Sequence, residues 1–152
     1  MDDASTSALN SSLIDKPIFD PADWRLNDFE AGLCAETRTL AQAKFAPRAS
    51  IIDREARFPT ENYEDLRSHD LLGICIPAEH GGRGADLRAY MLAAAEIGRY
   101  CGATALTFNM HNSSMMWSRF MYEMPHLTAE DRAAFAPLRA RQFRRAVAEQ
   151  GI

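Results

Sequence analysis

Apolar residues recur at intervals of three and four from Asn27 onward, the spacing that places side chains on one face of an α-helix. The first such segment is expected to begin at a cap formed by Asn27 or Asp28. Pro47 is expected to bend this helix without ending it, so that it runs on to Ala56. The residues predicted to face inward are Phe29, Leu33, Thr37, Leu40, Ala41, Ile51, Ile52 and Ala56.

The next helix is expected to begin at Thr60 and to stop at Gly73, because glycine readily adopts the left-handed backbone that ends a helix. A short, apolar, strand-like stretch then runs to Pro77. A turn follows that contains three glycines in four residues, Gly81, Gly82 and Gly84. Their expected role is structural, since glycine permits tight turns without strain.

Asp86 is expected to cap the clearest amphipathic helix of the chain. Its predicted inner face consists of Leu87, Tyr90, Met91, Ala94, Ile97, Gly98 and Cys101. The charged residues expected to face water are Arg88, Glu96 and Arg99. The segment 102–118 has no Asp, Glu, Lys or Arg and is predicted to be a nearly fully buried helix. It is too short and too rich in amides and hydroxyls for a transmembrane span.

Thr128 and Asp131 resemble a capping box, and Pro137 is expected to begin a last helix. The apolar residues of that helix are Leu138, Phe143, Ala146 and Val147. No segment shows strong alternation with a period of two. The sequence therefore predicts an all-α fold, a bundle of about six helices over residues 27–152. Residues 1–26 are expected to form a flexible or loosely docked tail.

Composition narrows the function classes. The chain is 47% hydrophobic and 25% charged, with a net charge of −4, which suits a soluble domain and disfavours binding to nucleic acid or anionic membranes. Its three cysteines form no C-x-x-C pair, and its four histidines have no partner four residues away. Neither a disulfide framework nor a metal site is therefore expected, and a reducing, cytoplasmic setting fits best.

Two segments resemble the N-terminal domain of the acyl-CoA dehydrogenase family. The first is the family's "Asp, Arg, then Phe-Pro" segment, present as Asp53, Arg54, Phe58 and Pro59. The second is its glycine-rich core, matched by Leu72, Gly73, Ile76, Pro77, Glu79, Gly81, Gly82 and Gly84. Looser matches are Glu96, Ile97 and Gly98 and the segment 110–114, so the resemblance covers about residues 28–150.

The resemblance implies a flavoprotein that uses FAD to oxidise an acyl-CoA thioester between its α and β carbons. In this family the catalytic base and most flavin contacts lie in later domains that this chain lacks. No catalytic residue is therefore assigned, the chain is expected to be a fragment, and alone it is expected neither to bind FAD tightly nor to turn over substrate. Its expected role is a wall of the acyl tunnel and a scaffold within a homo-oligomer.

The candidate tunnel-side residues lie on the helix after the glycine turn: Phe108, Asn109, His111, Asn112 and Met115. Plain core packing is the alternative for the apolar ones, and a backbone-bonded core histidine is the alternative for His111. Two other functions stay open. One is a flavin monooxygenase or oxidase on the same scaffold, and the other is a stand-alone, non-catalytic helical binding domain.

Overall fold

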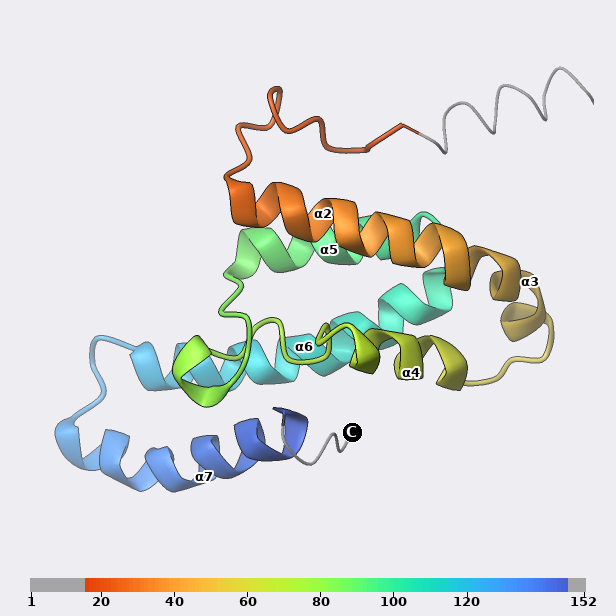
Figure 1. Cartoon of the computed structure of the whole chain (residues 1–152). Helices are drawn as coiled ribbons and strands as arrows, with labels where there is room; N and C mark the ends of the chain where they lie inside the picture. Colours follow the sequence, from red (N-terminus) through yellow and green to blue (C-terminus); the bar gives the residue numbers. More distant parts are fainter. Residues whose placement is uncertain (1–15, 148–152) are drawn as a thin grey trace, which may run out of the picture.

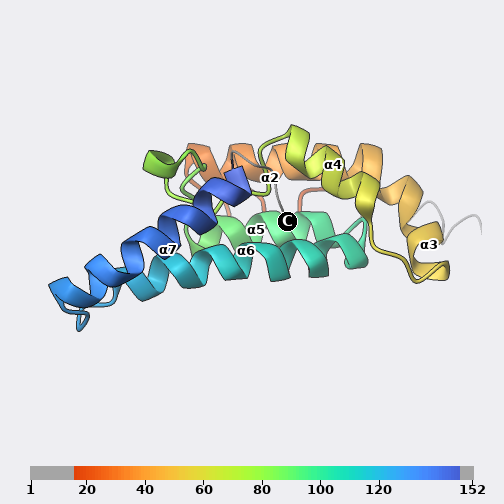
Figure 2. The same cartoon turned by 90° about the horizontal axis from the view of Figure 1, so that it is seen from below.

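The structure, a computed structural model, describes residues 16–147 and contains no β-strand in that range. Its α-helices are α2 (Asp28–Leu40), α3 (Ala46–Arg54), α4 (Thr60–Ser68), α5 (Leu87–Gly98), α6 (Gly102–Glu123) and α7 (Ala129–Val147). Helix α2 packs against α5, α5 against α6, and α6 against α7, as Figures 1 and 2 show. The all-α bundle predicted from the sequence is confirmed.

Asn27 begins α2 through a reciprocal capping box. Its side chain accepts a hydrogen bond from the Glu30 amide at 2.9 Å, and its own amide donates to the Glu30 carboxylate at 3.0 Å. This arrangement satisfies two backbone groups at the helix start, and it confirms the predicted cap.

A π-helical turn, Ala41–Phe45, joins α2 to α3. Pro47, which lacks an N–H group, sits in the first turn of α3, so the wider turn accommodates it and the helix continues with a bend as predicted. Ile52 is buried, but Ile51 and Ala56 are exposed, against expectation. Helix α3 ends at Arg54, so Ala56 lies in the following turn with a positive φ of 48°.

The segment between α4 and α5 is a buried series of turns and not a strand. Helix α4 ends at Ser68, and the left-handed residue that follows is Asp70 (φ 54°), not Gly73 as predicted. Residues 71–77 are all buried, which places an apolar segment with irregular backbone in the core. Burial on all sides explains why no polar positions alternate along it.

Helix α5 is covered on two sides, by α2 and by α6, and this corrects its predicted face. Asp86 does cap it, accepting from the Ala89 amide at 2.9 Å. Leu87 and Met91 are exposed, however, while Glu96 is fully buried. Glu96 lies 3.9 Å from Arg38 of α2 and 3.3 Å from Arg99, so a charge predicted to face water instead lies within the α2–α5 interface.

Helices α6 and α7 also differ from expectation. The α6 segment predicted to be nearly fully buried has one buried face, with its opposite face open. Helix α7 starts at the Thr128–Asp131 capping box and passes through Pro137 without ending. Of the apolar residues named for this helix, Phe143 is fully buried, and Leu138 is exposed to solvent.

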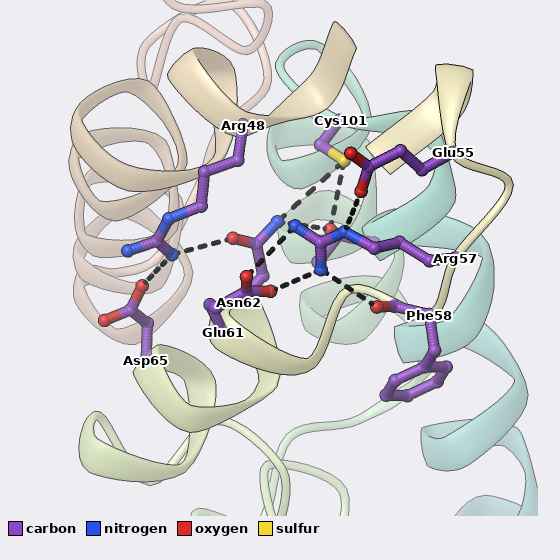
Figure 3. A network of polar contacts seen from close by, with 9 residues as sticks. Arg48, Glu55, Arg57, Phe58, Glu61, Asn62, Asp65 and Cys101 are labelled. Carbon is purple, nitrogen blue, oxygen red and sulfur yellow. Dashed lines mark hydrogen bonds and ion pairs between the residues drawn. The ribbon is translucent and has the colours of Figure 1, made fainter. Parts of the chain in front are cut away.

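A buried polar network fixes the N-terminal end of α6 (Figure 3). The Asn62 side chain of α4 accepts a hydrogen bond from Arg48 of α3 at 2.8 Å and donates one to Thr104 of α6 at 2.8 Å. Arg48 also pairs with Asp65 at 2.6 Å. Because Asn62 is fully buried, losing either partner would leave a desolvated polar group. The network therefore holds three helices in register at this end of the bundle.

Candidate functional site

An apolar groove of about 630 Å³ opens between the start of α5 and the C-terminal half of α6. Its lining is mostly hydrophobic, and its polar groups are the hydroxyls of Tyr90 and Ser113 and the carboxylate of Glu123. The lining residues are Leu87, Tyr90, Ser113, Met116, Trp117, Phe120, Glu123, Met124 and Pro125. A groove of this size suits an apolar ligand or a segment of another domain. It contains no cationic side chain, so nothing in it matches the pyrophosphate of FAD.

An exposed apolar stripe extends this groove along α6. Its members follow the spacing of one helix face, which places them side by side: Leu106, Met110, Ser113, Trp117 and Phe120. The four hydrophobic members are between 44% and 67% exposed. Leu87 and Met91 of α5 are also exposed and lie one turn apart. A contiguous apolar surface of this kind marks an interaction or ligand site.

Tyr90 is the polar group deepest in the groove wall. Its hydroxyl donates a hydrogen bond to the Asn109 carbonyl at 3.2 Å, and burial raises the pKa of Tyr90 to about 12, with Cys75 adding to the rise. The phenol therefore stays protonated at neutral pH, and it serves as a fixed donor. The groove's carboxylate, Glu123, accepts from Arg119 at 3.2 Å.

The five predicted tunnel residues fall on different sides of α6. Phe108, Asn112 and Met115 lie in the core, where the Asn112 side chain donates to the Phe108 carbonyl at 3.2 Å. Asn109 is exposed beside the stripe. The His111 ring points the other way and donates from Nε2 to the Leu72 carbonyl at 2.9 Å. The structure therefore does not gather these five residues into one surface of this domain.

The open side of α6 differs from the prediction that segment 102–118 is a nearly fully buried helix. The signal was present in the helical spacing of Leu106, Met110 and Trp117, which lie opposite Phe108, Asn112 and Met115. Because α6 has apolar residues on both faces and no charge in this segment, the sequence pattern does not show which face is open.

The triple-glycine turn is explained without a ligand. Gly81 and Gly84 have positive φ values of 86° and 71°. A Cβ added to Gly82 would lie 2.2 Å from the Ile76 carbonyl oxygen. The amides of residues 81–84 all donate to backbone carbonyls, and Arg83 pairs with Glu36 at 2.8 Å, so none of these amides is free to cradle a phosphate.

Two further site classes find no support in the described chain. Within residues 16–147 no three His, Cys, Asp or Glu side chains gather closely enough to hold a metal ion. No helix of that same range has both the length and the apolar character needed to cross a bilayer. The three cysteines are all buried, and burial raises the pKa of Cys75 to about 12 and that of Cys34 to about 11, so neither of these two thiols is activated.

Comparison with known proteins agrees with this architecture. The family model described as "Acyl-CoA dehydrogenase, N-terminal domain" matches residues 28–123. A probable acyl-CoA dehydrogenase of Bacillus subtilis, YngJ, is 35% identical over 71 residues, which are 47% of this chain and 19% of the relative. The short-chain specific acyl-CoA dehydrogenase of Clostridium acetobutylicum is 34% identical over 76 residues, 50% of this chain and 20% of the relative.

A third relative carries out a different reaction. The 3-sulfinopropanoyl-CoA desulfinase of Paraburkholderia xenovorans is 33% identical over 81 residues, 53% of this chain and 21% of the relative. The chain thus spans about a fifth of the length of these relatives. No solved structure matches it significantly. Because the family model covers well over half of the sequence, the chain belongs to the acyl-CoA dehydrogenase family, of which it carries the helical N-terminal domain.

Proposed function

We propose that this chain is the N-terminal domain of a flavin-dependent enzyme that oxidises an acyl-CoA thioester between its α and β carbons. In this proposal the exposed face of α6 forms one wall of the acyl tunnel, and the bundle acts as a scaffold in a cytoplasmic homo-oligomer. The observation that supports it most directly is the apolar stripe from Leu106 to Phe120, which a stable soluble protein must cover.

The proposed wall works by excluding water and not by reacting. Leu106, Met110 and Trp117 offer only apolar surface, which suits an alkyl chain. Tyr90 stays neutral, and the only carboxylate lining the groove, Glu123, is paired with Arg119. The base and the flavin are accordingly proposed to lie in the parts that the relatives have and this chain does not span.

Substrate class is better supported than reaction type. Two relatives are named acyl-CoA dehydrogenases and the third a desulfinase, but the name of each gives an acyl-CoA as its substrate. We therefore propose an acyl-CoA substrate first and dehydrogenation second, since a shared fold does not fix the chemistry.

The first test is the coding sequence downstream of Ile152. A β-rich stretch followed by a long helical region with a carboxylate base would support the proposal. Its product should carry FAD, and acyl-CoA should bleach the flavin under anaerobic conditions. A full-length product that is yellow but is not bleached by any acyl-CoA from C4 to C16 would refute the dehydrogenase assignment.

The groove itself favours one alternative, a stand-alone domain that binds acyl chains without catalysis. The groove is present in this chain, and its lining is mostly apolar. A stop codon directly after Ile152, together with saturable binding of octanoyl-CoA by the 152-residue chain, would favour that alternative. A Met110→Asp variant should lose such binding, and Ala43→Asp, an exposed substitution in the turn Ala41–Phe45 that adds the same charge, should keep it.

A further inference from the structure

A second groove follows the seam between α6 and α7. It consists of two adjoining hollows of about 350 and 220 Å³ that share Leu138 and Gln142 in their walls. The two helices pack together here (Figure 2), joined by the Ser118–Gln142 hydrogen bond and by Arg139, which lies 4.4 Å from the Tyr122 ring centre. The seam is therefore closed at its base and open above.

The smaller hollow is mainly apolar. Trp117, Met121 and Phe135 surround Leu138 in it, and all four of these side chains are exposed, Leu138 to 64%. Its volume is below the roughly 300–1,000 Å³ of small-molecule sites. The hollow therefore suits side chains of another helix better than a cofactor.

Helix α7 presents an exposed outer face next to this hollow. The helix lies at the edge of the bundle (Figure 1), and its core contacts come from Phe143 and Ala146, which are buried. The opposite, outer face is exposed along the helix at positions spaced by three and four residues, among them Glu130, Ala134, Pro137, Leu138, Arg141 and Arg144. The family match ends at residue 123, before α7, so it gives no reason for this exposed face.

The charges of the outer face are separated along the helix. The acidic residues of α7 are Glu130 and Asp131 in its first turn, and residues 132–147 contain no acidic side chain. Arg141 and Arg144 are exposed near the other end. Asp131 belongs to the capping box of the helix, whereas the side chains of Glu130, Arg141 and Arg144 make no hydrogen bond or ion pair with any residue that the structure describes. The outer face thus has an unpaired acidic end and an unpaired basic end.

Such a helix is complementary to a second, antiparallel copy of itself. In a two-fold dimer, residue i of one protomer contacts residue j of its partner, and residue j contacts residue i. Leu138 is the middle residue of Ala129–Val147. A two-fold axis at Leu138 places Glu130, eight residues before it, beside Arg144 of the partner, six residues after it, with an offset of about 3 Å along the helix axes. Antiparallel helices also have opposed dipoles, which attract.

We propose that two copies of this chain associate through their α7 helices, antiparallel about a two-fold axis near Leu138. At the centre, Leu138 of each protomer packs on Leu138 of its partner and on the hollow lined by Trp117 and Phe135. The small residues of the outer face let the helices approach closely. A Glu130–Arg144 pair closes the contact at each end.

This contact specifies the surface of the homo-oligomer in the proposed function, and it rests on that part of the proposal alone. It does not depend on the flavin chemistry. It is also separate from the α5–α6 groove, although Trp117 lines both.

Sedimentation equilibrium of the 152-residue chain tests the contact. Met110→Asp removes association through the α6 stripe, and a monomer–dimer equilibrium should remain in this variant. In the same background, Leu138→Asp places two carboxylates at the axis and should weaken dimerisation tenfold or more. Ile51→Asp makes an equivalent change at an exposed aliphatic residue of α3, and it should alter dimerisation less than twofold.

Exchange of the end charges tests the antiparallel orientation. Glu130→Arg alone and Arg144→Glu alone each bring like charges together, and each should weaken the dimer about fivefold at low salt. The double variant should restore dimerisation, and an equimolar mixture of the two single variants should form a heterodimer, because every pair is again of opposite sign. Glu64→Arg, at an exposed position of α4, makes the same change of charge and should alter dimerisation less than twofold.

Four results would overturn the proposal. A Met110→Asp variant that is monomeric at about 100 μM would show that the face forms no specific contact. Single charge variants that behave like Glu64→Arg, or that do not pair when mixed, would exclude the antiparallel register. Association that continues beyond a dimer would indicate a head-to-tail contact. A monomeric chain that binds vesicles with anionic lipid would identify a membrane-facing surface instead. None of these results changes whether acyl-CoA bleaches the flavin, so failure here is distinguishable from failure of the proposed function.

Discussion

Replacing Gly82 with alanine tests how tightly the glycine corner is packed. The added Cβ would lie 2.2 Å from the Ile76 carbonyl oxygen and 2.6 Å from the Gly73 carbonyl oxygen. Both oxygens accept backbone hydrogen bonds, from Gly84 at 2.8 Å and from Arg83 at 3.3 Å, so neither can move without loosening the corner. No flexible side chain is available to yield in their place.

Overpacking of this kind costs about 1–3 kcal/mol, and disturbing the two hydrogen bonds adds about 1 kcal/mol. We therefore expect Gly82→Ala to lower the free energy of unfolding by about 2–4 kcal/mol. For a domain of this size that corresponds to a fall of roughly 10 °C in the melting temperature. Urea unfolding followed by far-ultraviolet circular dichroism measures the free energy directly.

Gly32→Ala is the matched control, because Gly32 lies in α2, is exposed and has no atom within 4 Å of an added Cβ. Alanine is favoured over glycine inside a helix, so this variant should gain about 0.5–1 kcal/mol. A Gly82→Ala variant as stable as the unaltered chain would refute the close-packed corner. Equal destabilisation by both substitutions would show that the effect is not specific to the corner.

Three further predictions concern the network, a buried histidine and the open face. Asn62→Leu removes the hydrogen bonds that Arg48 and buried Thr104 make to Asn62, and it should cost about 2–3 kcal/mol in urea unfolding. Asp65→Asn, in a partly exposed ion pair, should cost under about 1 kcal/mol, and equal costs would contradict this ranking. Burial lowers the pKa of His111 below the usual 6.5, with the Leu72 hydrogen bond opposing, so the unfolded chain takes up a proton first as the pH falls. The stability that His111 contributes is thus present above pH 6.5 and is lost as the pH falls from there toward the lower folded pKa. Urea midpoints of unfolding measured between pH 7.5 and 5 should therefore decline less steeply in His111→Gln than in the unaltered chain. Parallel curves would show that protonation of His111 does not cause the loss of stability. Met110→Asp, on the exposed stripe, should change the free energy of unfolding by less than about 0.5 kcal/mol. It should reduce the fluorescence of a bound hydrophobic dye and the self-association measured by light scattering. Unchanged dye binding would show that the dye does not bind to the stripe.

Local signals in the sequence predicted the helix starts well. Asn27, Asp86 and Thr128 each cap the helix that they were expected to begin, because a cap depends on a side chain and an amide only two or three residues away. Pro47 bends the first long helix without ending it for the same local reason. The family resemblance likewise rests on short motifs that are read directly from the chain, and the family model confirms it.

Side-chain burial was predicted less well, because it depends on which neighbours cover each helix. Glu96 was expected in water but lies between α2 and α5 beside Arg38. Leu138, one of the apolar residues of the predicted last helix, faces solvent, while Phe143 and Ala146 of the same helix are buried. Asp70, and not Gly73, adopts the left-handed backbone after α4. Such outcomes follow from contacts between segments far apart in the chain.

The candidate sites illustrate the same division. The sequence pointed to α6 as the functional helix, but its five nominated residues lie partly in the core and partly on different sides of the helix. The packing of α5 and α7 decides which face of α6 is exposed. Because both faces of α6 are apolar, the sequence pattern of the helix alone does not distinguish the buried face from the exposed stripe. The seam with α7 likewise needed residues from both helices, 13 to 35 positions apart, to be brought together.

The sequence by itself determined the helical class, the helix starts at Asn27, Asp86 and Thr128, the glycine corner and the family, since each rests on interactions within a few residues or on a short motif. Only the tertiary structure decided which faces are buried, that Glu96 is enclosed, and that two separate grooves flank α6. The physical reason is that burial is a property of packed pairs of elements. The free energy gained by burying an apolar side chain does not depend on which apolar neighbour buries it. The sequence pattern of a single helix therefore does not specify which other helix packs against it.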